Sequence, residues 1–137
     1  MILVDTGPLI ALFDPRDTAH AQCRQTLESV REPLCTTTPV LTEAFHLLSP
    51  ASIGSNRLRD FIAQGGMSVW YLTDATLVRA FELMEQYADQ SMDLADATLV
   101  TAAETLDTTK VFSIDRRDFD RYRVRRGHNH IGFQVLP

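Results

Sequence analysis

The sequence predicts an α/β protein with a mainly parallel sheet. Short apolar segments alternate with amphipathic segments of ten or more residues, the pattern of strands joined by crossover helices. The first of these, residues 2–4, is an unbroken apolar run, typical of a strand covered on both faces. The chain has 137 residues, of which 45% are hydrophobic and 23% charged. We therefore expect a single domain, residues 1–137, with a core of its own.

Asp5 follows the first apolar run directly, and open parallel sheets bind ligands at the carboxyl ends of their strands. Gly7 permits a tight turn, and Pro8 suits the first position of a helix. The alternative, equally favoured on local grounds, is that Asp5 or Thr6 is simply the N-cap of that helix. A ligand-binding role and a capping role for Asp5 therefore both stay open at this point.

The remaining elements follow from apolar periodicity and from the prolines and glycines between them. Helices are predicted at residues 9–13, from 17 or 18 to about 31, at 38–48 and 55–64, from 73 or 74 through at least 84, and at 93–106. Further strands are predicted at 34–36, 68–72, 110–114 and 131–136. No repeat, low-complexity tract or linker divides the chain.

Composition narrows the class of protein. A formal net charge of −5 argues against nucleic-acid binding by bulk attraction. No apolar run is long enough to cross a bilayer, and the start lacks the features of a signal peptide. Cys23 and Cys35 have no metal-type spacing and indicate buried thiols in a reducing compartment, so a cytoplasmic location is expected.

Basic residues are concentrated near the end of the chain. Seven of the 13 lie between residues 110 and 126: Lys110, Arg116, Arg117, Arg121, Arg123, Arg125 and Arg126. Such a run forms either a solvated surface or a set of phosphate contacts beside an otherwise acidic site.

Four acids occupy positions where elements can present them to one crevice. Asp5 and Asp115 each end a predicted strand, Glu43 lies between Val40 and Leu47 on a helix, and Asp96 shares a helical stripe with apolar residues. An acid on a core-facing stripe is costly unless something pairs it or a metal binds it. Each acid also has a local explanation, namely solvation for Glu43, helix capping by Asp93 with Asp96 in the first turn, and an Asx turn at Asp115.

Clustered carboxylates repel one another, so at least one should have a raised pKa unless a cation is present. Mg²⁺ and Mn²⁺ prefer oxygen ligands and would relieve that repulsion. A site of this kind is well suited to phosphoryl chemistry. The sequence contains no glycine-rich phosphate loop, no Gly-x-Ser-x-Gly motif and no compact zinc-type spacing of its four histidines.

The chain resembles PIN-domain ribonucleases, specifically the toxins of VapBC-type toxin–antitoxin pairs. Four segments carry the resemblance over nearly the whole length: Val4-Asp5-Thr6-Gly7, Pro39-x-x-x-Glu43, Leu94-Ala-Asp96-Ala-Thr-Leu-Val, and Val111-Phe-Ser-Ile-Asp115-Arg-Arg-Asp118-Phe119. The resemblance implies a three-layer α/β/α sandwich with a five-stranded sheet in the order 3-2-1-4-5. It also implies a Mg²⁺-dependent endoribonuclease, with Mn²⁺ able to substitute.

Matched to the family pattern, the metal-binding and catalytic carboxylates are Asp5, Glu43, Asp96 and Asp115. The auxiliary residues are Thr6, Asp93, Ser113 and Asp118, and the candidate RNA contacts are Arg116, Arg117, Arg121, Arg123, Arg125 and Arg126. Implied partners are an RNA substrate, a small antitoxin whose apolar helix would pack on residues 9–13 and 44–48, and a second copy in a homodimer. The alternatives are an RNA-processing or structure-specific nuclease outside toxin–antitoxin systems, and a non-catalytic interaction module.

Overall fold

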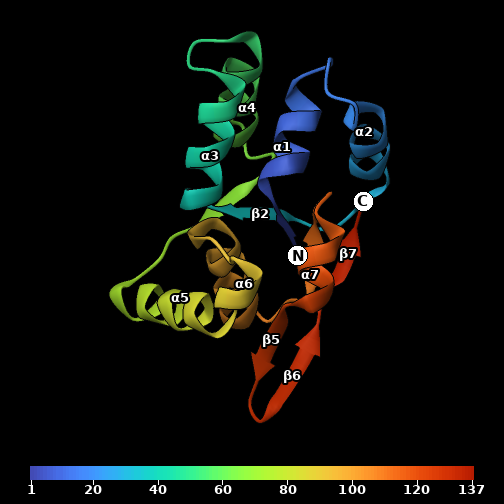
Figure 1. Cartoon of the computed structure of the whole chain (residues 1–137). Coiled ribbons are helices and arrows are strands. Elements are labelled where there is room, and N and C mark those ends of the chain that lie inside the picture. The colour runs from blue at the N-terminus through green and yellow to red at the C-terminus, as the bar shows by residue number, and fades with distance from the viewer.

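A computed structural model describes all residues, 1–137. Five strands form one parallel sheet in the order β3-β2-β1-β4-β7 (Figure 1). Their bounds are β1 Ile2–Val4, β2 Leu34–Thr37, β3 Ser68–Trp70, β4 Lys110–Phe112 and β7 Gln134–Leu136. The predicted order is confirmed, with β7 as the fifth strand of the sheet. All four pairings are parallel, because a helical crossover or a longer excursion separates each strand from its neighbour.

Helices cover both faces of the sheet. They are α1 Thr6–Phe13, α2 His20–Ser29, α3 Thr38–Leu48, α4 Ile53–Ala63, α5 Asp74–Gln86, α6 Leu94–Leu106 and α7 Arg116–Arg121, with a single 3₁₀ turn at Ala88–Gln90. Figure 1 shows α1 to α4 gathered on one side of the sheet and α5 with α6 on the other. This is the three-layer α/β/α sandwich that the family resemblance implied. None of the helices has the length and apolar character needed to span a bilayer.

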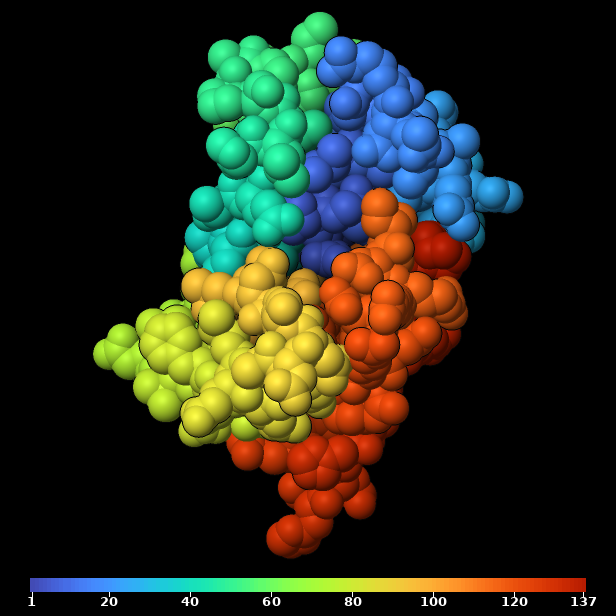
Figure 2. All heavy atoms as spheres, viewed as in Figure 1, coloured from blue at the N-terminus to red at the C-terminus, as the bar shows by residue number.

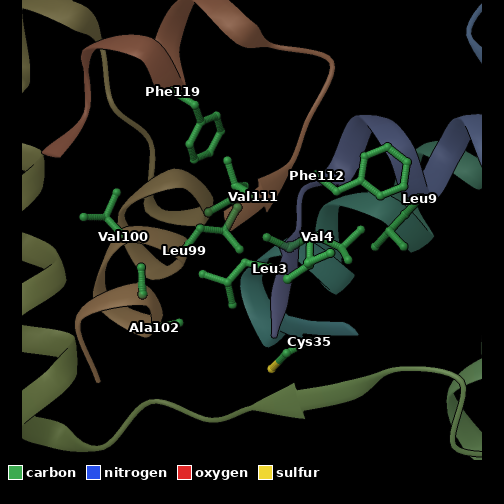
Figure 3. Packing of buried hydrophobic residues seen from close by; sticks show 14 of the residues in the cluster. Leu3, Val4, Leu9, Cys35, Leu99, Val100, Ala102, Val111, Phe112 and Phe119 are labelled. Atoms are coloured by element: carbon green, nitrogen blue, oxygen red, sulfur yellow. The ribbon is translucent and has the colours of Figure 1, made fainter. Parts of the chain in front are cut away.

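The central strand is buried along its whole length. Leu3 and Val4 of β1 lie between α6 and the start of the chain's first helix, and Val111 and Phe112 of β4 pack beside them (Figure 3). Burial on both faces explains why β1 is an unbroken apolar run. Cys35 and Cys23 are also buried and free, as predicted.

Several helix starts are set by local capping. The hydroxyl of Ser52 accepts a hydrogen bond of 3.0 Å from the Ser55 amide, so α4 begins two residues earlier than predicted. Thr73 and Thr76 form a reciprocal capping box at the start of α5. Pro8 occupies the third position of α1, not the first, because the helix already begins at Thr6.

The end of the chain differs from the prediction. The apolar segment 131–136 is not one strand, because strand pairing is interrupted at Phe133, whose ring packs against Phe119 with centroids 5.4 Å apart. Two strands, β5 Arg123–Arg126 and β6 Asn129–Gly132, form an antiparallel hairpin joined by a two-residue loop. Gly127 in that loop has a φ of 58°, which suits a tight hairpin turn. The arginine-rich segment is therefore partly a β-ribbon that extends away from the sheet (Figure 1).

Two polar links hold α6 in place against its neighbours. The hydroxyls of Thr37 and Thr98, both buried, are 2.7 Å apart and join the end of β2 to α6. Arg79 of α5 makes a two-pronged ion pair with Glu104 of α6 at 2.8 and 3.0 Å. The same carboxylate accepts the Arg125 amide at 2.9 Å, so α5, α6 and the hairpin meet at one side chain.

Candidate active site

An acidic cleft lies at the carboxyl edge of the sheet, where β1 and β4 end. Its volume is about 270 Å³, and six carboxylates line it: Asp5, Glu43, Asp93, Asp96, Asp115 and Asp118. No lysine, arginine or histidine lines it. Figure 2 shows the hollow, with the dark blue atoms of the first residues between α3 in teal, the start of α6 in gold and α7 in orange. The structure therefore brings together all four predicted metal ligands and both auxiliary acids.

Asp5 is the most deeply buried acid of the cleft. It caps α1, with Oδ1 accepting the Thr6 amide at 2.8 Å, and it also faces the cleft. The two interpretations that the sequence left open are therefore compatible. Oδ2 accepts the hydroxyl of Ser113 at 2.8 Å. Burial raises the pKa of Asp5 to about 6, although the hydrogen bonds from Ser113 and Thr6 oppose that rise.

Ser113 connects the two central strand ends. Its hydroxyl donates to Asp5 and accepts the amide of Asp115 at 3.0 Å. The serine is almost completely buried at the end of β4. It therefore fixes the orientation of the Asp5 carboxylate and the path of the chain that carries Asp115.

Asp96 lies in the first turn of α6 and is half-buried. Its Oδ2 accepts the hydroxyl of Tyr122 at 2.8 Å, and its amide donates to Oδ1 of Asp93, the N-cap of α6, at 2.8 Å. Burial, followed by the negative charges of Asp5 and Asp93, raises the pKa of Asp96 to about 8. Asp93 thus both caps the helix and lines the cleft, a point that the sequence alone left undecided.

Asp93 is exposed, and the other three acids are also accessible. Glu43 on α3 and Asp115 before α7 are exposed, and Asp118 is intermediate. The predicted core-facing stripe around Glu43 is only half right, because Val40 is buried whereas Leu47 is 56% exposed. Desolvation and the adjacent Asp115 raise the pKa of Asp118, an effect that Arg121 and Arg117 oppose.

The six predicted RNA-contacting arginines occupy three different settings. Arg116, Arg117 and Arg121 are exposed on α7, which carries Asp118 into the cleft. Arg123 and Arg125 lie on the exposed face of the β5–β6 hairpin, at alternate positions of β5. Arg126 lies on the opposite face and forms an ion pair with Asp107 at 2.7 Å.

Comparison with known families decides the classification. The sequence of residues 2–124 matches the PIN domain. The chain belongs to the PIN-domain family.

Relatives of this PIN domain include ribonuclease VapC26 of Mycobacterium tuberculosis. The two are 26% identical over an alignment of 139 positions, which covers 99% of this chain and 100% of the relative. Among solved structures, the fold is similar to that of M. tuberculosis VapC20, a toxin that cleaves the sarcin–ricin loop. That match has a TM-score of 0.76 and 20% identity, and covers 85% of this chain and 91% of that one. A toxin–antitoxin complex from Klebsiella pneumoniae matches with a TM-score of 0.68 and 20% identity. The match covers 88% of this chain and 92% of that chain.

The donor set of this PIN domain fits a hard divalent cation. Carboxylate oxygens are the ligands that Mg²⁺ and Mn²⁺ prefer, and the cleft holds six acids without a basic side chain. Thr6 adds a buried hydroxyl without any hydrogen-bond partner at the same place. As the side chains stand, however, no three of them converge closely enough to hold an ion. The exposed acids would have to turn inward toward Asp5 and Asp96.

Sequence reasoning missed Tyr122. The residue follows α7 directly, is completely buried and donates to Asp96 across 26 residues of sequence. The available signal was a tyrosine three residues after Phe119 within a strongly basic segment, since an aromatic pair at that spacing indicates a buried face.

Proposed function

We propose that this PIN domain is a Mg²⁺-dependent endoribonuclease, with Mn²⁺ able to substitute, and that it acts as the toxin of a type II toxin–antitoxin pair. The observation that carries the proposal is the cleft of six carboxylates, in which burial and mutual repulsion raise the pKa of Asp5 and of Asp96. A cation bound there would relieve that repulsion. The ribonuclease relative, similar along its entire length, supports RNA as the substrate.

Asp5, Glu43, Asp96 and Asp115 are the residues that we propose as metal ligands and catalytic groups. When bound, the cation would polarise the phosphodiester and lower the pKa of an attacking water. Asp5 is preorganised for this role, since Ser113 and the Thr6 amide fix both of its oxygens. With its pKa raised to about 8, Asp96 is largely protonated at neutral pH, and a bound cation would favour its ionised form.

The auxiliary residues shape the cleft around these ligands. Asp93 caps α6 and thereby holds the turn that carries Asp96. Asp118 adds a further acceptor at the entrance. Thr6 offers its unpartnered hydroxyl to a water or to a substrate oxygen. Arg117 and Arg121, close enough to oppose the pKa rise of Asp118, would receive phosphates beside the acidic centre.

A restraining antitoxin is part of the proposal. The similarity of this fold to a chain in a toxin–antitoxin complex supports a small protein partner. When no cation is bound, an arginine from that partner could bridge two carboxylates of the cleft. A cytoplasmic location belongs to the same proposal, and homodimer formation stays a prediction.

The predicted antitoxin contacts need revision. Leu9, Ala44 and Leu48 are buried in the core, so residues 9–13 and 44–48 do not offer continuous apolar surfaces. Two grooves of about 400 and 500 Å³ flank Phe13 instead, one beside the exposed Ile53 and the other beside Phe61. Because α1 runs from the cleft to Phe13 over only about 10 Å, a short partner segment could occupy a groove and reach the acids.

Cleavage assays with Asp5→Asn and Asp96→Asn test the proposed function. Each change keeps the shape of the side chain and removes a charge, so cleavage of RNA in Mg²⁺ or Mn²⁺ should fall by at least about a hundredfold. Asp60→Asn, an exposed position on α4 outside the cleft, is the matched control and should retain parental activity. Parental rates for Asp5→Asn, or full activity of the wild type in EDTA, would refute the proposal.

A further inference from the structure

The phenol of Tyr122 makes a single hydrogen bond, and that bond goes to the cleft. The side chain is completely buried at the junction of α7 and β5, and its hydroxyl donates to Oδ2 of Asp96 at 2.8 Å. Oδ1 of Asp96 receives no hydrogen bond from the protein. The bond therefore restricts the rotation of the carboxylate, whose Oδ1 keeps its lone pairs for another partner, in a residue that lines the cleft.

Aromatic packing holds the phenol in this position. The ring of Tyr122 meets Tyr87 edge-on, with centroids 5.1 Å apart and an interplanar angle of 68°. It meets Phe119 in the same manner at 5.3 Å and 81°. Such contacts are favourable beyond the area that they bury. Tyr87 in turn accepts the Arg123 amide at 3.0 Å, which ties the following strand to the same cluster.

We propose that Tyr122 is a positioning residue for Asp96, presenting its carboxylate to a divalent cation as Ser113 does for Asp5. The inference rests on the proposed function, since it assigns a role to Asp96 in cation binding. Groups that hydrogen-bond to metal ligands fix ligand orientation, and their loss weakens metal affinity by roughly ten- to a hundredfold. A purely structural role is the competing explanation, because a buried phenol needs an acceptor wherever it lies.

The fold offers a matched pair of variants that separates the two explanations. Tyr122→Phe removes the hydroxyl that donates to Asp96 and keeps the ring. Tyr87→Phe removes a second buried hydroxyl from the same aromatic cluster. The only hydrogen bond of that hydroxyl is with the Arg123 amide. Both variants lose one buried hydrogen bond, so both should melt slightly earlier in EDTA.

The deciding measurement is the Mn²⁺ concentration at which half of the metal-induced rise in melting temperature is reached. We expect Tyr122→Phe to raise that concentration by roughly tenfold relative to the wild type. The value for Tyr87→Phe should stay close to that of the wild type. In cleavage assays, Tyr122→Phe should recover activity when Mn²⁺ is raised, whereas a folding defect would not respond. 4-Aminophenylalanine incorporated at position 122 retains an N–H donor and should restore the wild-type Mn²⁺ response.

The opposite outcomes are equally clear. Equal Mn²⁺ midpoints for Tyr122→Phe and Tyr87→Phe, or a lower midpoint for Tyr122→Phe, would overturn the positioning role. If Tyr122→Phe does not fold, failure of the 4-aminophenylalanine protein to match the wild-type midpoint would overturn it instead. Asp96→Asn separates this failure from failure of the proposed function. If the wild type and Asp96→Asn respond to Mn²⁺ identically, Asp96 is not a ligand and the proposed metal site itself is wrong.

Discussion

Ser113 donates a hydrogen bond of 2.8 Å to Asp5 across 108 residues of sequence. The bond joins the ends of two adjacent parallel strands, β1 and β4, at the floor of the acidic cleft. The bond opposes the effect of burial, which raises the pKa of Asp5 to about 6. Several testable properties of the cleft depend on this contact and on its counterpart at Asp96.

Ser113→Ala should lower nuclease activity by roughly tenfold, because Asp5 loses the donor that fixes one of its oxygens. Stability should fall by about 2 kcal/mol, since the change removes two hydrogen bonds, one to Asp5 and one from the Asp115 amide. Ser68→Ala is the matched control, a strand serine that donates to the Leu34 carbonyl at 3.2 Å away from the cleft. Activity of Ser113→Ala equal to that of Ser68→Ala would show that Asp5 needs no such support.

Divalent cations should raise the melting temperature by mass action, because the clustered carboxylates of the folded state bind them preferentially. We expect Mn²⁺ to act at lower concentration than Mg²⁺, and Ca²⁺ to bind while supporting little turnover. Thermal melts in EDTA and in millimolar metal measure this. Superimposable curves for the wild type, with and without Mn²⁺, would contradict a metal site in the cleft.

Stability in EDTA should fall as the pH rises from about 4 to about 8. In the folded state the pKa of Asp5 is raised to about 6 and that of Asp96 to about 8, from the 3.8 of an ordinary aspartate. Between the two limits the folded chain binds more protons than the unfolded chain, so the free energy of unfolding decreases with pH. Below about pH 4 both carboxyls are protonated in the folded and in the unfolded chain, so this loss of stability is absent.

Asp96→Asn tests the origin of that slope. The free energy of unfolding of this variant should depend less steeply on pH than that of the wild type across the same range, because the group with the larger pKa rise no longer titrates. Mn²⁺ should also stabilise the wild type more at pH 8 than at pH 5.5, where protons compete with it. A wild-type stability that increases steadily from pH 5 to pH 8 in EDTA would be inconsistent with raised pKa values at these acids.

Charge reversal tests RNA contacts by the arginines of α7 and by those of the hairpin separately. Arg117→Glu with Arg121→Glu, on the helix beside the cleft, should weaken RNA binding and reduce the salt slope by about one per residue. Arg123→Glu with Arg125→Glu, on the outward face of the hairpin, should act in the same direction if the hairpin also contacts phosphates. Salt slopes equal to that of the wild type in both double variants would mean that these arginines are merely solvated.

Expression of the wild type alone should be toxic or poorly tolerated, and Asp96→Asn should relieve it. A cognate small protein encoded beside the gene should co-purify and suppress cleavage, and should lose potency when its cleft-binding arginine is replaced. Growth assays and co-purification measure both effects. Abundant, harmless expression of active enzyme without such a neighbour would point to RNA processing outside toxin–antitoxin systems.

Local chemistry was sufficient to predict much of the molecule. The apolar run of β1 predicted a strand buried on both faces, and Asp93 predicted the start of α6. Asp5, Glu43 and Asp96 were each placed correctly at a strand end or on a helix, whereas Asp115 lies three residues beyond the end of β4, as the N-cap of α7. These features depend on residues within a few positions of one another, and such interactions can be read along the chain.

Only the tertiary structure decided how these elements meet. Neither the bond from Tyr122 to Asp96 nor that from Ser113 to Asp5 has a local signature, because the partners are 26 and 108 residues apart. The exposure of Leu47 depends on which helices cover α3, and the division of segment 131–136 depends on where the ring of Phe133 packs. The sequence by itself determined which residues could form an acidic centre; packing between distant elements decided how deeply each acid is buried and which donors hold it, and therefore how far each pKa moves.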